Sequence, residues 1–192
     1  VSDGPMQVQV KVSRANYNDA TASATLTITK QAIELTADSG SWTYDASEHT
    51  KPSYTITDGS FATGEGLTSA TFAATSAITN AGSVANTITG VTPKDGTQEN
   101  DYAFTYKAGT LTITNATFSV TLTGGSWTYN GGAHSATLTG TQSSDTIEYR
   151  TSTNGGTTWS TWSSTKPSVT HVSDSPMQVQ VKVSRANYND AT

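Results

Sequence analysis

The sequence predicts an all-β protein of tandem small immunoglobulin-like β-sandwich modules. Three observations indicate this fold class: apolar and polar residues alternate along short segments, turn dipeptides separate those segments, and long stretches of the sequence recur. Alternation with a period of two places apolar side chains on one face of a strand. Short strands separated by frequent turns are typical of sandwiches. A β-grasp-like module is the alternative, although no segment has a convincing helical pattern to lie across its sheet.

The alternation is clearest in three segments. Their apolar residues are Met177, Val179, Val181 and Val183; Leu26 and Ile28; and Phe118, Val120 and Leu122. Threonine occupies many of the intervening positions, where its branched Cβ suits a pleated strand. Each segment therefore predicts a half-buried strand.

Turn dipeptides lie between the alternating segments. They are Asp58-Gly59, Asp95-Gly96, Asn130-Gly131 and Asn154-Gly155. Each supplies residues that tolerate positive φ, which tight turns between strands require.

Composition favours a folded chain over disorder and excludes several partners. Apolar residues make up 33% and charged residues 13%, and the net charge is −5, whereas disordered chains usually combine high net charge with few aromatic residues. The pI near 5.0 and the scattered basic residues argue against nucleic-acid binding. Without cysteine the chain has neither disulfides nor thiolate metal ligands. No apolar stretch approaches the roughly 18 residues of a membrane span, so we expect no membrane insertion in this segment. No apolar stretch follows a charged start as in a signal peptide. We therefore expect an internal fragment of a longer protein.

A near-identical duplication organises the sequence. Val1–Thr21 recurs as Val172–Thr192, 171 residues later, with Gly4 replaced by Ser175 as the one difference. Repeats at a fixed period indicate arrays of structural modules. The chain is therefore expected to come from a long tandem array.

A weaker repeat of 85 residues lies within the longer one. It aligns Ser39–Thr50 with Gly124–Ser135, including Trp42 with Trp127, and it carries Leu26–Thr29 onto Leu111–Thr114. We expect the two aligned tryptophans to be equivalent core residues.

The two periods predict the domain boundaries. Residues 1–31 hold the C-terminal strands of a preceding second-type module, 32–116 form the first module, and 117–192 form a second module that lacks its last strand. The joint between the two modules is the short segment Asn115-Ala116, which favours a stiff connection.

The phase of the repeat gives Leu26 and Ile28 a specific role. The segment after Thr21 contains the strand that residues 117–192 lack, so these two side chains are expected to be buried against a second-type module. The repeats are either joined covalently in a continuous fibre or linked head to tail by strand donation. The continuous fibre is favoured, because donation leaves the duplicate Val1–Thr21 redundant.

Few residues suggest ligand chemistry. Trp159 and Trp162 differ in parity, so on a regular strand one of them faces solvent and could stack on a sugar, with Tyr149 as their hairpin neighbour. Packing of these rings on Tyr149 or on a neighbouring module is the competing interpretation.

No catalytic, cofactor-binding or metal-ligating residue is predicted. His49 and His134 occupy equivalent repeat positions but have no partner at metal-ligand spacing. Asp95, Glu99 and Asp101 could supply oxygens to Ca2+, although their order does not fit an EF-hand loop and a solvated turn is favoured.

Four motifs of the first module give a resemblance to a known family. They are SWTYDASEHT (Ser41–Thr50), GEGL (Gly64–Leu67), NAGSVANTI (Asn80–Ile88) and DYAFTYKAGTLTIT (Asp101–Thr114). Together they resemble the MBG/YDG-type repeats of bacterial cell-surface proteins, and the second module is similar to bacterial Ig-like repeats in its middle. The resemblance implies a secreted or cell-surface location in large adhesins or fibres, and it carries no catalytic residues.

The sequence thus predicts a non-enzymatic structural repeat, a stiff spacer in a surface stalk, fibre or adhesin whose partners are neighbouring copies of itself. One alternative is an adhesin module that binds a host or matrix glycan or protein. A second alternative is a spacer in a secreted glycan-degrading enzyme.

Overall fold

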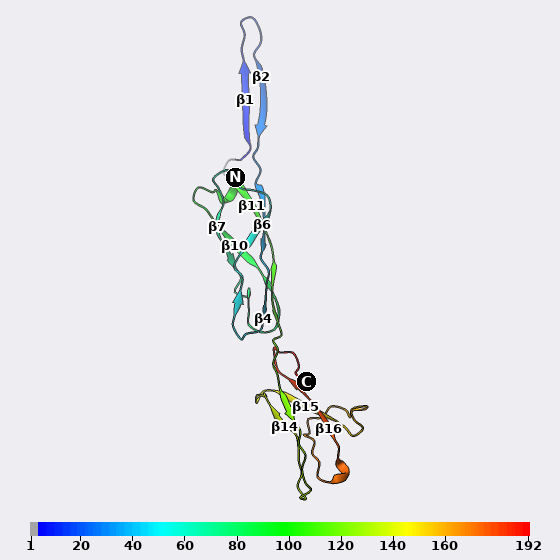
Figure 1. Cartoon of the computed structure of the whole chain (residues 1–192). Helices are drawn as coiled ribbons and strands as arrows, with labels where there is room; N and C mark the ends of the chain where they lie inside the picture. The colour runs from blue at the N-terminus through cyan, green and yellow to red at the C-terminus, as the bar shows by residue number, and fades with distance from the viewer. Residues whose placement is uncertain (1–3) are drawn as a thin grey trace. The chain divides into compact units, whose positions relative to one another are not determined.

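The computed structural model describes residues 4–192 and confirms the all-β class (Figure 1). Apart from strands, the described residues form two 3₁₀ turns, η1 (Glu99–Asp101) and η2 (Val172–Asp174). The part of the chain that the structure describes contains no α-helix, so the β-grasp alternative lacks the helix that would lie across its sheet. No described helix is long and apolar enough to cross a membrane.

The chain forms two compact units. Unit 1 comprises the residues up to Ser41 with Glu48–Ile78 and Ser83–Thr112, and unit 2 comprises Trp42–Ser47, Thr79–Gly82 and Ile113–Thr192. Each unit is described by itself below. The first three residues of the duplicated segment, Val1–Asp3, lie outside the described residues.

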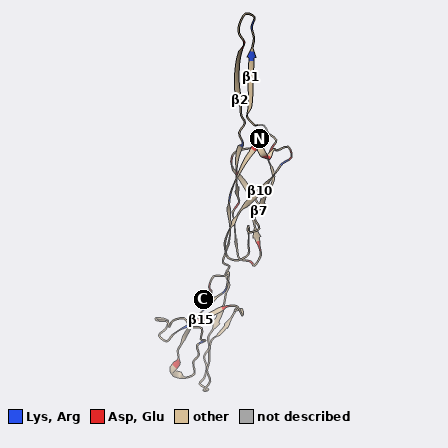
Figure 2. Ribbon diagram, turned by 180° about the vertical axis from the view of Figure 1, so that it is seen from behind, with Lys and Arg blue, Asp and Glu red and all other residues tan. Residues whose placement is uncertain are grey.

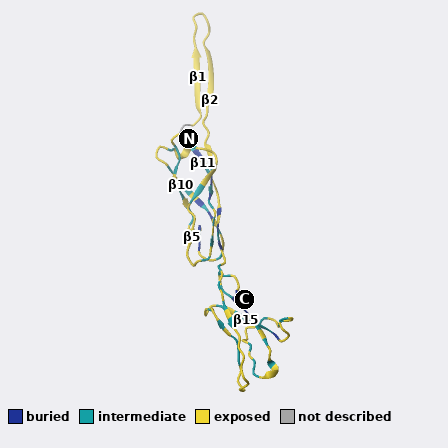
Figure 3. Cartoon of the chain, viewed as in Figure 1, coloured by how far each residue is buried: buried dark blue, intermediate teal, exposed yellow. Residues whose placement is uncertain are grey.

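Unit 1 begins with an antiparallel hairpin of β1 (Met6–Val12) and β2 (Ala20–Leu26), which pair from Met6↔Leu26 to Val12↔Ala20. The hairpin is exposed along its whole length (Figure 3). Leu26 is 58% and Ile28 74% exposed. Their predicted burial against a second-type module is therefore not reached within this chain, and burial against a second copy stays a prediction.

The remaining strands of unit 1 and its boundaries form several small sheets. They are β3 (Gln31–Ala37), β4 (Gly40–Thr43), β5 (His49–Thr50), β6 (Tyr54–Asp58), β7 (Leu67–Phe72), β8 (Ala77–Ile78), β9 (Gly82–Asn86), β10 (Ile88–Pro93), β11 (Tyr102–Lys107) and β12 (Gly109–Thr114). The sheet orders are β11-β3-β6, β4-β12-β9, β10-β7 and β5-β8. Strand β3 pairs in parallel with β11 and antiparallel with β6.

The core of unit 1 lies between strands of different sheets. Ile33, Leu35 and Ala37 of β3 pack with Ile88 of β10 and Tyr102 of β11, and all five are buried. Apolar side chains that alternate along β3 explain this, because one face of the strand is covered while Glu34 and Thr36 lie on the other. The arrangement is that of a β-sandwich.

Unit 2 contains β13 (Thr121–Thr123), β14 (Thr137–Thr139), β15 (Thr146–Ser152) and β16 (Gln178–Ser184). Its antiparallel pairs are β13-β14 and β15-β16. Tyr149, Val181 and Val183 form its buried core, with Val120 and Leu122 packed against them. The alternation predicted for Val179–Val183 is confirmed.

The predicted turns are also confirmed. Gly59, Gly96, Gly131 and Gly155 have φ of 78°, 88°, 80° and 71°. Glycine carries no Cβ and adopts this left-handed region without steric cost.

The duplicated segments adopt the same local structure. Asn16 and Asn187 both have φ of 67°, and the backbone N–H of Tyr17 and of Tyr188 donates to the carbonyl three residues earlier at 3.0 and 3.1 Å. The pair Val12↔Ala20 of the hairpin recurs as Val183↔Ala191. The same sequence therefore gives the same turn and the same hairpin register twice.

The weaker 85-residue repeat is visible in strand pairing as well. Gln31 pairs in parallel with Tyr102, and Ala116, which is 85 residues after Gln31, forms a parallel bridge with Tyr188. Tyr102 begins β11, and Tyr188 occupies the corresponding position of the NY motif after β16. Equivalent positions of the two repeats thus make equivalent strand contacts.

Charged side chains on the strands lie on polar faces and pair locally. Charged residues are scattered along the chain (Figure 2). Lys11 of β1 pairs with Asp19, and Lys182 of β16 pairs with Glu148 of β15. These pairs occupy the faces opposite the valine rows, as the alternation predicts.

Candidate functional site

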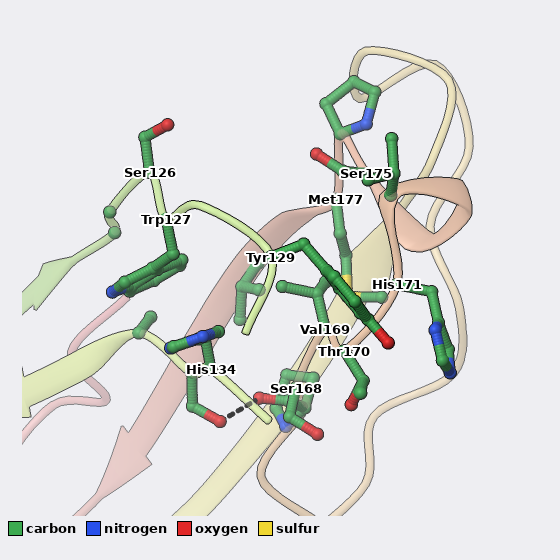
Figure 4. A pocket seen from close by; sticks show the side chains of 18 of the residues that line it. Ser126, Trp127, Tyr129, His134, Ser168, Val169, Thr170, His171, Ser175 and Met177 are labelled. Carbon is green, nitrogen blue, oxygen red and sulfur yellow. Dashed lines mark hydrogen bonds between the residues drawn. The ribbon is translucent and has the colours of Figure 1, made fainter. Parts of the chain in front are cut away.

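A groove in unit 2 is lined by aromatic rings and hydroxyl groups and has a volume of about 420 Å³ (Figure 4). We call it the aromatic groove and define it by Trp127, Tyr129, His134, His171 and Met177. The first two follow β13 on an irregular segment, His134 precedes β14, and Met177 precedes β16. Three separate stretches of the chain therefore build one concave surface.

Trp127 lies flat on His134. Their ring centroids are 4.9 Å apart and the rings are 11° from parallel, as Figure 4 shows. A Cβ at Gly125 would lie 2.6 Å from the indole, so glycine at this position leaves room for the folded-back ring. His134 is held by backbone hydrogen bonds to Val169 in both directions, each 2.9 Å.

The opposite wall is formed by Tyr129 and His171, whose rings stack with centroids 6.1 Å apart. The Asp174 carboxylate accepts hydrogen bonds from the backbone N–H groups of His171 (2.8 Å) and Thr170 (3.0 Å). These two bonds lower the pKa of Asp174, because they stabilise its charged form. The turn that carries His171 is therefore fixed by a carboxylate that stays ionised near neutral pH.

The predicted core role of Trp127 is wrong. Trp127 is 46% and Tyr129 60% exposed, whereas Trp42 is half-buried. Trp42 lies on β4, which pairs with β12, and its carbonyl accepts a hydrogen bond from Thr114 Oγ1 at 3.2 Å. Within residues 4–192, the segment around Trp127 pairs with no such strand, and this leaves its ring uncovered.

No charged side chain lines the aromatic groove. Its polar groups are the two imidazoles and the hydroxyls of Ser126, Thr128, Tyr129, Ser135, Ser168, Thr170 and Ser175. A carboxylate pair for acid–base chemistry is therefore missing from the lining. Planar rings beside neutral hydroxyls suit an uncharged ligand that stacks and exchanges hydrogen bonds.

No metal site appears among the described residues. Residues 4–192 hold no group of three His, Cys, Asp or Glu side chains that could bind an ion, including the segment with Asp95, Glu99 and Asp101. His134 interacts instead with Asn130, whose Oδ1 lies 3.1 Å from its Nε2.

A second cavity, of about 490 Å³, lies beside β16 and is lined by Val120, Leu122, Arg150, Trp162, Val179, Gln180, Val181 and Thr192. Val179 and Val181 line it from the apolar face of the strand and Gln180 from the polar face, so the cavity wraps around the strand edge. Its other walls include Val120 and Leu122 of the core. We call it the edge groove. It adjoins the aromatic groove, since Leu122 and Val179 line both.

None of the predicted ligand contacts lines the aromatic groove, but Trp162 lines the edge groove together with Arg150. Tyr149 is 8% exposed and belongs to the core, so it offers no surface for a ligand. Trp159 and Trp162 are half-buried and both lie against Arg150, whose guanidinium is 5.1 and 4.6 Å from their ring centroids. Ligand contact by the two tryptophans stays a prediction.

Trp159 and Trp162 were expected to face opposite sides only on a regular strand without a bulge, and this segment is not a regular strand. Tyr149 pairs with Ser163 in both directions, but Thr151 accepts from Ser160. Two residues along β15 are thus matched by three in the partner segment, as in a β-bulge. The extra residue reverses the parity and brings both rings to the Arg150 side.

Comparisons with protein-family models, with curated proteins and with solved structures find no match for this chain.

Proposed function

We propose that the chain is a repeat of a long bacterial surface stalk, fibre or adhesin, and that its modules act as a stiff spacer. The observation that carries this proposal is the duplicated segment, which adopts the same turn at Asn16 and Asn187 and the same hairpin register. A repeated unit with a fixed local structure is what an array of modules requires. The resemblance to MBG/YDG-type and bacterial Ig-like repeats supports the cell-surface location.

The backbone of Ala116, which ends the joint, is fixed within unit 2. Ala116 donates from its N–H to the Asn187 carbonyl at 3.0 Å and accepts from the Asn189 N–H at 2.9 Å. Hydrogen bonds on both polar groups of one residue hold the backbone, unlike the solvated backbone of a flexible linker.

Small-angle scattering of the whole chain tests the spacer. We expect an extended particle for the parent, and a broader distribution of sizes after insertion of four Gly-Ser residues behind Asn115. The matched control carries the same insertion in the exposed turn at Gly64. A compact, folded-back parent would contradict the proposal.

A second candidate function is ligand binding by an adhesin module. The exposure of Trp127 (46%) and Tyr129 (60%) in a concave, uncharged surface favours it, because exposed planar rings stack on sugar rings. Binding of neutral glycans, followed by tryptophan fluorescence, should be lost in Trp127→Ala and kept in Trp159→Ala. Equal binding by both variants would rule out the aromatic groove as the site.

The proposal that the chain is not an enzyme is tested separately. The whole chain is incubated with glycan and peptide substrates, and we expect no hydrolysis. Turnover that disappears in His134→Ala, the imidazole under Trp127, would overturn the assignment.

A further inference from the structure

We propose that Asn130 is a site of spontaneous deamidation, which converts its side-chain amide into a carboxylate and adds one negative charge to the second module. Asn130 is the first residue of the tripeptide Asn130-Gly131-Gly132, which forms an exposed turn of unit 2. The turn lies within one module, so its modification is independent of the proposed array function.

An asparagine followed by glycine reacts with its own backbone. The glycine nitrogen forms a bond to the side-chain carbon Cγ, the bond from Cγ to Nδ2 breaks, and ammonia leaves with the proton of the glycine N–H. Glycine has no Cβ to obstruct this approach. Water then opens the cyclic imide: cleavage of the new bond gives aspartate, and cleavage of the original peptide bond gives isoaspartate. Water is the one co-reactant, and no atom is oxidised or reduced.

The chain contains the tripeptide Asn-Gly-Gly twice, starting at Asn130 and at Asn154. Both asparagines are exposed, and the glycines that follow them have similar φ values, 80° for Gly131 and 71° for Gly155. The two sites thus share the reacting groups and the access to water. A difference in their rates therefore comes from the hydrogen bonds of the two side chains.

The Asn130 side chain is held in position for the attack. Its Oδ1 accepts a hydrogen bond from the backbone N–H of Gly132 at 2.9 Å, which folds the side chain over the peptide of Gly131. The same oxygen lies 3.1 Å from Nε2 of His134, and Nε2 is the donor because an amide oxygen only accepts. Two donors stabilise the negative charge that develops on this oxygen during the attack. Within the described residues, the leaving group Nδ2 donates to no other group.

The Asn154 side chain is locked in a different arrangement. Its Oδ1 accepts from the Ser152 hydroxyl at 2.8 Å and from the backbone N–H of Thr158 at 3.0 Å. Its Nδ2 donates to Thr158 Oγ1 at 2.8 Å, so the leaving group is bonded as well. Reaction at Asn154 requires the release of at least two of these bonds, which lowers its rate about tenfold to a hundredfold.

The first module shows that an aspartate fits this turn. The 85-residue repeat aligns Asn130 with Asp45, whose Oδ1 accepts from the backbone N–H two residues further on at 2.8 Å, as that of Asn130 does. Ala46 has φ of 65°, close to the 80° of Gly131. Deamidation thus gives the second module the carboxylate that the first module carries four residues before its histidine.

Incubation of the whole chain at neutral to mildly basic pH tests the site. Peptide mapping by mass spectrometry detects the exchange of NH2 for OH, and chromatography separates aspartate from isoaspartate. Asn130 should convert about tenfold to a hundredfold faster than Asn154, which is the control in the same sample. In concentrated urea, where both turns are unfolded, the two rates should become similar.

Gly131→Ala tests the attacking nitrogen. Nothing lies within 4 Å of a Cβ at Gly131, and Ala46 adopts a similar φ at the equivalent position of the first module, so the turn is retained. The added methyl group obstructs the approach to Cγ, and conversion of Asn130 should be largely lost. Conversion of Asn154 should stay at the parent's rate, and a rise in that rate would reveal that the variant has unfolded.

His134→Phe tests the second donor. It keeps a ring beneath Trp127 and removes the bond from Nε2 to Oδ1. Conversion of Asn130 should slow about three- to tenfold, the effect of one hydrogen bond, with no change at Asn154.

Equal conversion of Asn130 and Asn154 in the folded chain would overturn the inference. A difference that persists in urea would also overturn it, as would conversion of Asn130 that survives Gly131→Ala. A compact parent chain in the scattering experiment would refute the spacer and leave the modification of Asn130 intact, because the turn lies inside unit 2.

Discussion

At the residue scale, unit 1 depends on one buried amide. Asn86 is 0% exposed, and its Nδ2 donates to the carbonyls of Asp38 and Lys51, each at 2.8 Å. Its Oδ1 is buried and has no hydrogen-bond partner among the described residues. The amide is therefore retained for its two donor bonds, which join segments distant in sequence.

Asn86→Ala should destabilise unit 1 by about 1–3 kcal/mol, because the carbonyls of Asp38 and Lys51 lose their part-buried donor. The free energy of unfolding in urea, followed by circular dichroism, measures the change. Asn115→Ala, at an exposed position, is the matched control and should be close to neutral. Equal stability of Asn86→Ala and the parent would refute this role.

Unit 2 has a comparable polar contact in Asp145 and Arg185. The guanidinium donates from Nε and Nη2 to the two carboxylate oxygens, both at 2.8 Å. These bonds, aided by the backbone N–H of Gln142, lower the pKa of Asp145 from 3.8 to about 2. Arg185 also lies 4.1 Å from the centroid of Phe118, so the pair anchors the turn to the core.

The lowered pKa predicts an acid dependence. A carboxylate whose folded pKa lies below its unfolded value contributes stability above about pH 4, and this is lost as pH falls toward 2. Between pH 4 and pH 2 the urea midpoint of unit 2 should therefore fall less in Asp145→Asn than in the parent. Asp95→Asn, at an exposed turn, should keep the parent's pH dependence. Parallel curves for Asp145→Asn and the parent would contradict the assignment.

At the element scale, the last strand of the first module approaches the first one closely. A Cβ at Gly109 would lie 2.4 Å from the Ala37 carbonyl oxygen and 2.6 Å from that of Asp38. Both contacts are with backbone, which cannot move aside as a flexible side chain can. Gly109 thus permits β12 to continue from β11 beside β3 and β4.

Gly109→Ala should destabilise unit 1 by about 1–3 kcal/mol through this overpacking. Chemical denaturation followed by circular dichroism gives the difference. Gly66→Ala is the control, since nothing lies within 4 Å of a Cβ there. If the two alanine variants were equally stable, the close approach would carry no energetic weight.

The positions of strands and turns could be predicted from the local sequence pattern, whereas the solvent exposure of individual side chains could not. The valine alternation of β16 and the Asn-Gly and Asp-Gly turns depend on neighbours in sequence, so they were found directly. The β-bulge opposite Tyr149 depends on how two segments pair. It turns one of the two tryptophans to the opposite face from the one that a regular strand would give it. The exposure of Trp127 likewise depends on a strand that is distant in sequence. The 85-residue alignment of Trp127 with Trp42 could not reveal this exposure. Such an alignment compares residue types and does not show which strands cover a side chain.

At the scale of the whole molecule, the two units have separate cores. The core of unit 1 is centred on Ile33 and Leu35, and that of unit 2 on Val181 and Val183. No described residue belongs to both clusters. The repeat of the sequence predicts this organisation, because each module must bury its own apolar face.

Separate cores predict separate unfolding transitions. Trp127, Trp159 and Trp162 lie in unit 2, whereas Trp42 lies on β4, which pairs with β12, so in a Trp42→Phe background tryptophan fluorescence follows unit 2 while circular dichroism follows both units. Leu35→Ala removes a fully buried side chain from unit 1 and should destabilise that unit by about 2–5 kcal/mol. The midpoint of the unfolding transition should fall when it is followed by circular dichroism and stay unchanged when it is followed by tryptophan fluorescence. Val183→Ala, the matched core change in unit 2, should shift the fluorescence transition instead. If Leu35→Ala moved both signals together, the two cores would unfold as one cooperative structure, and the array would consist of larger units than the sequence repeat implies.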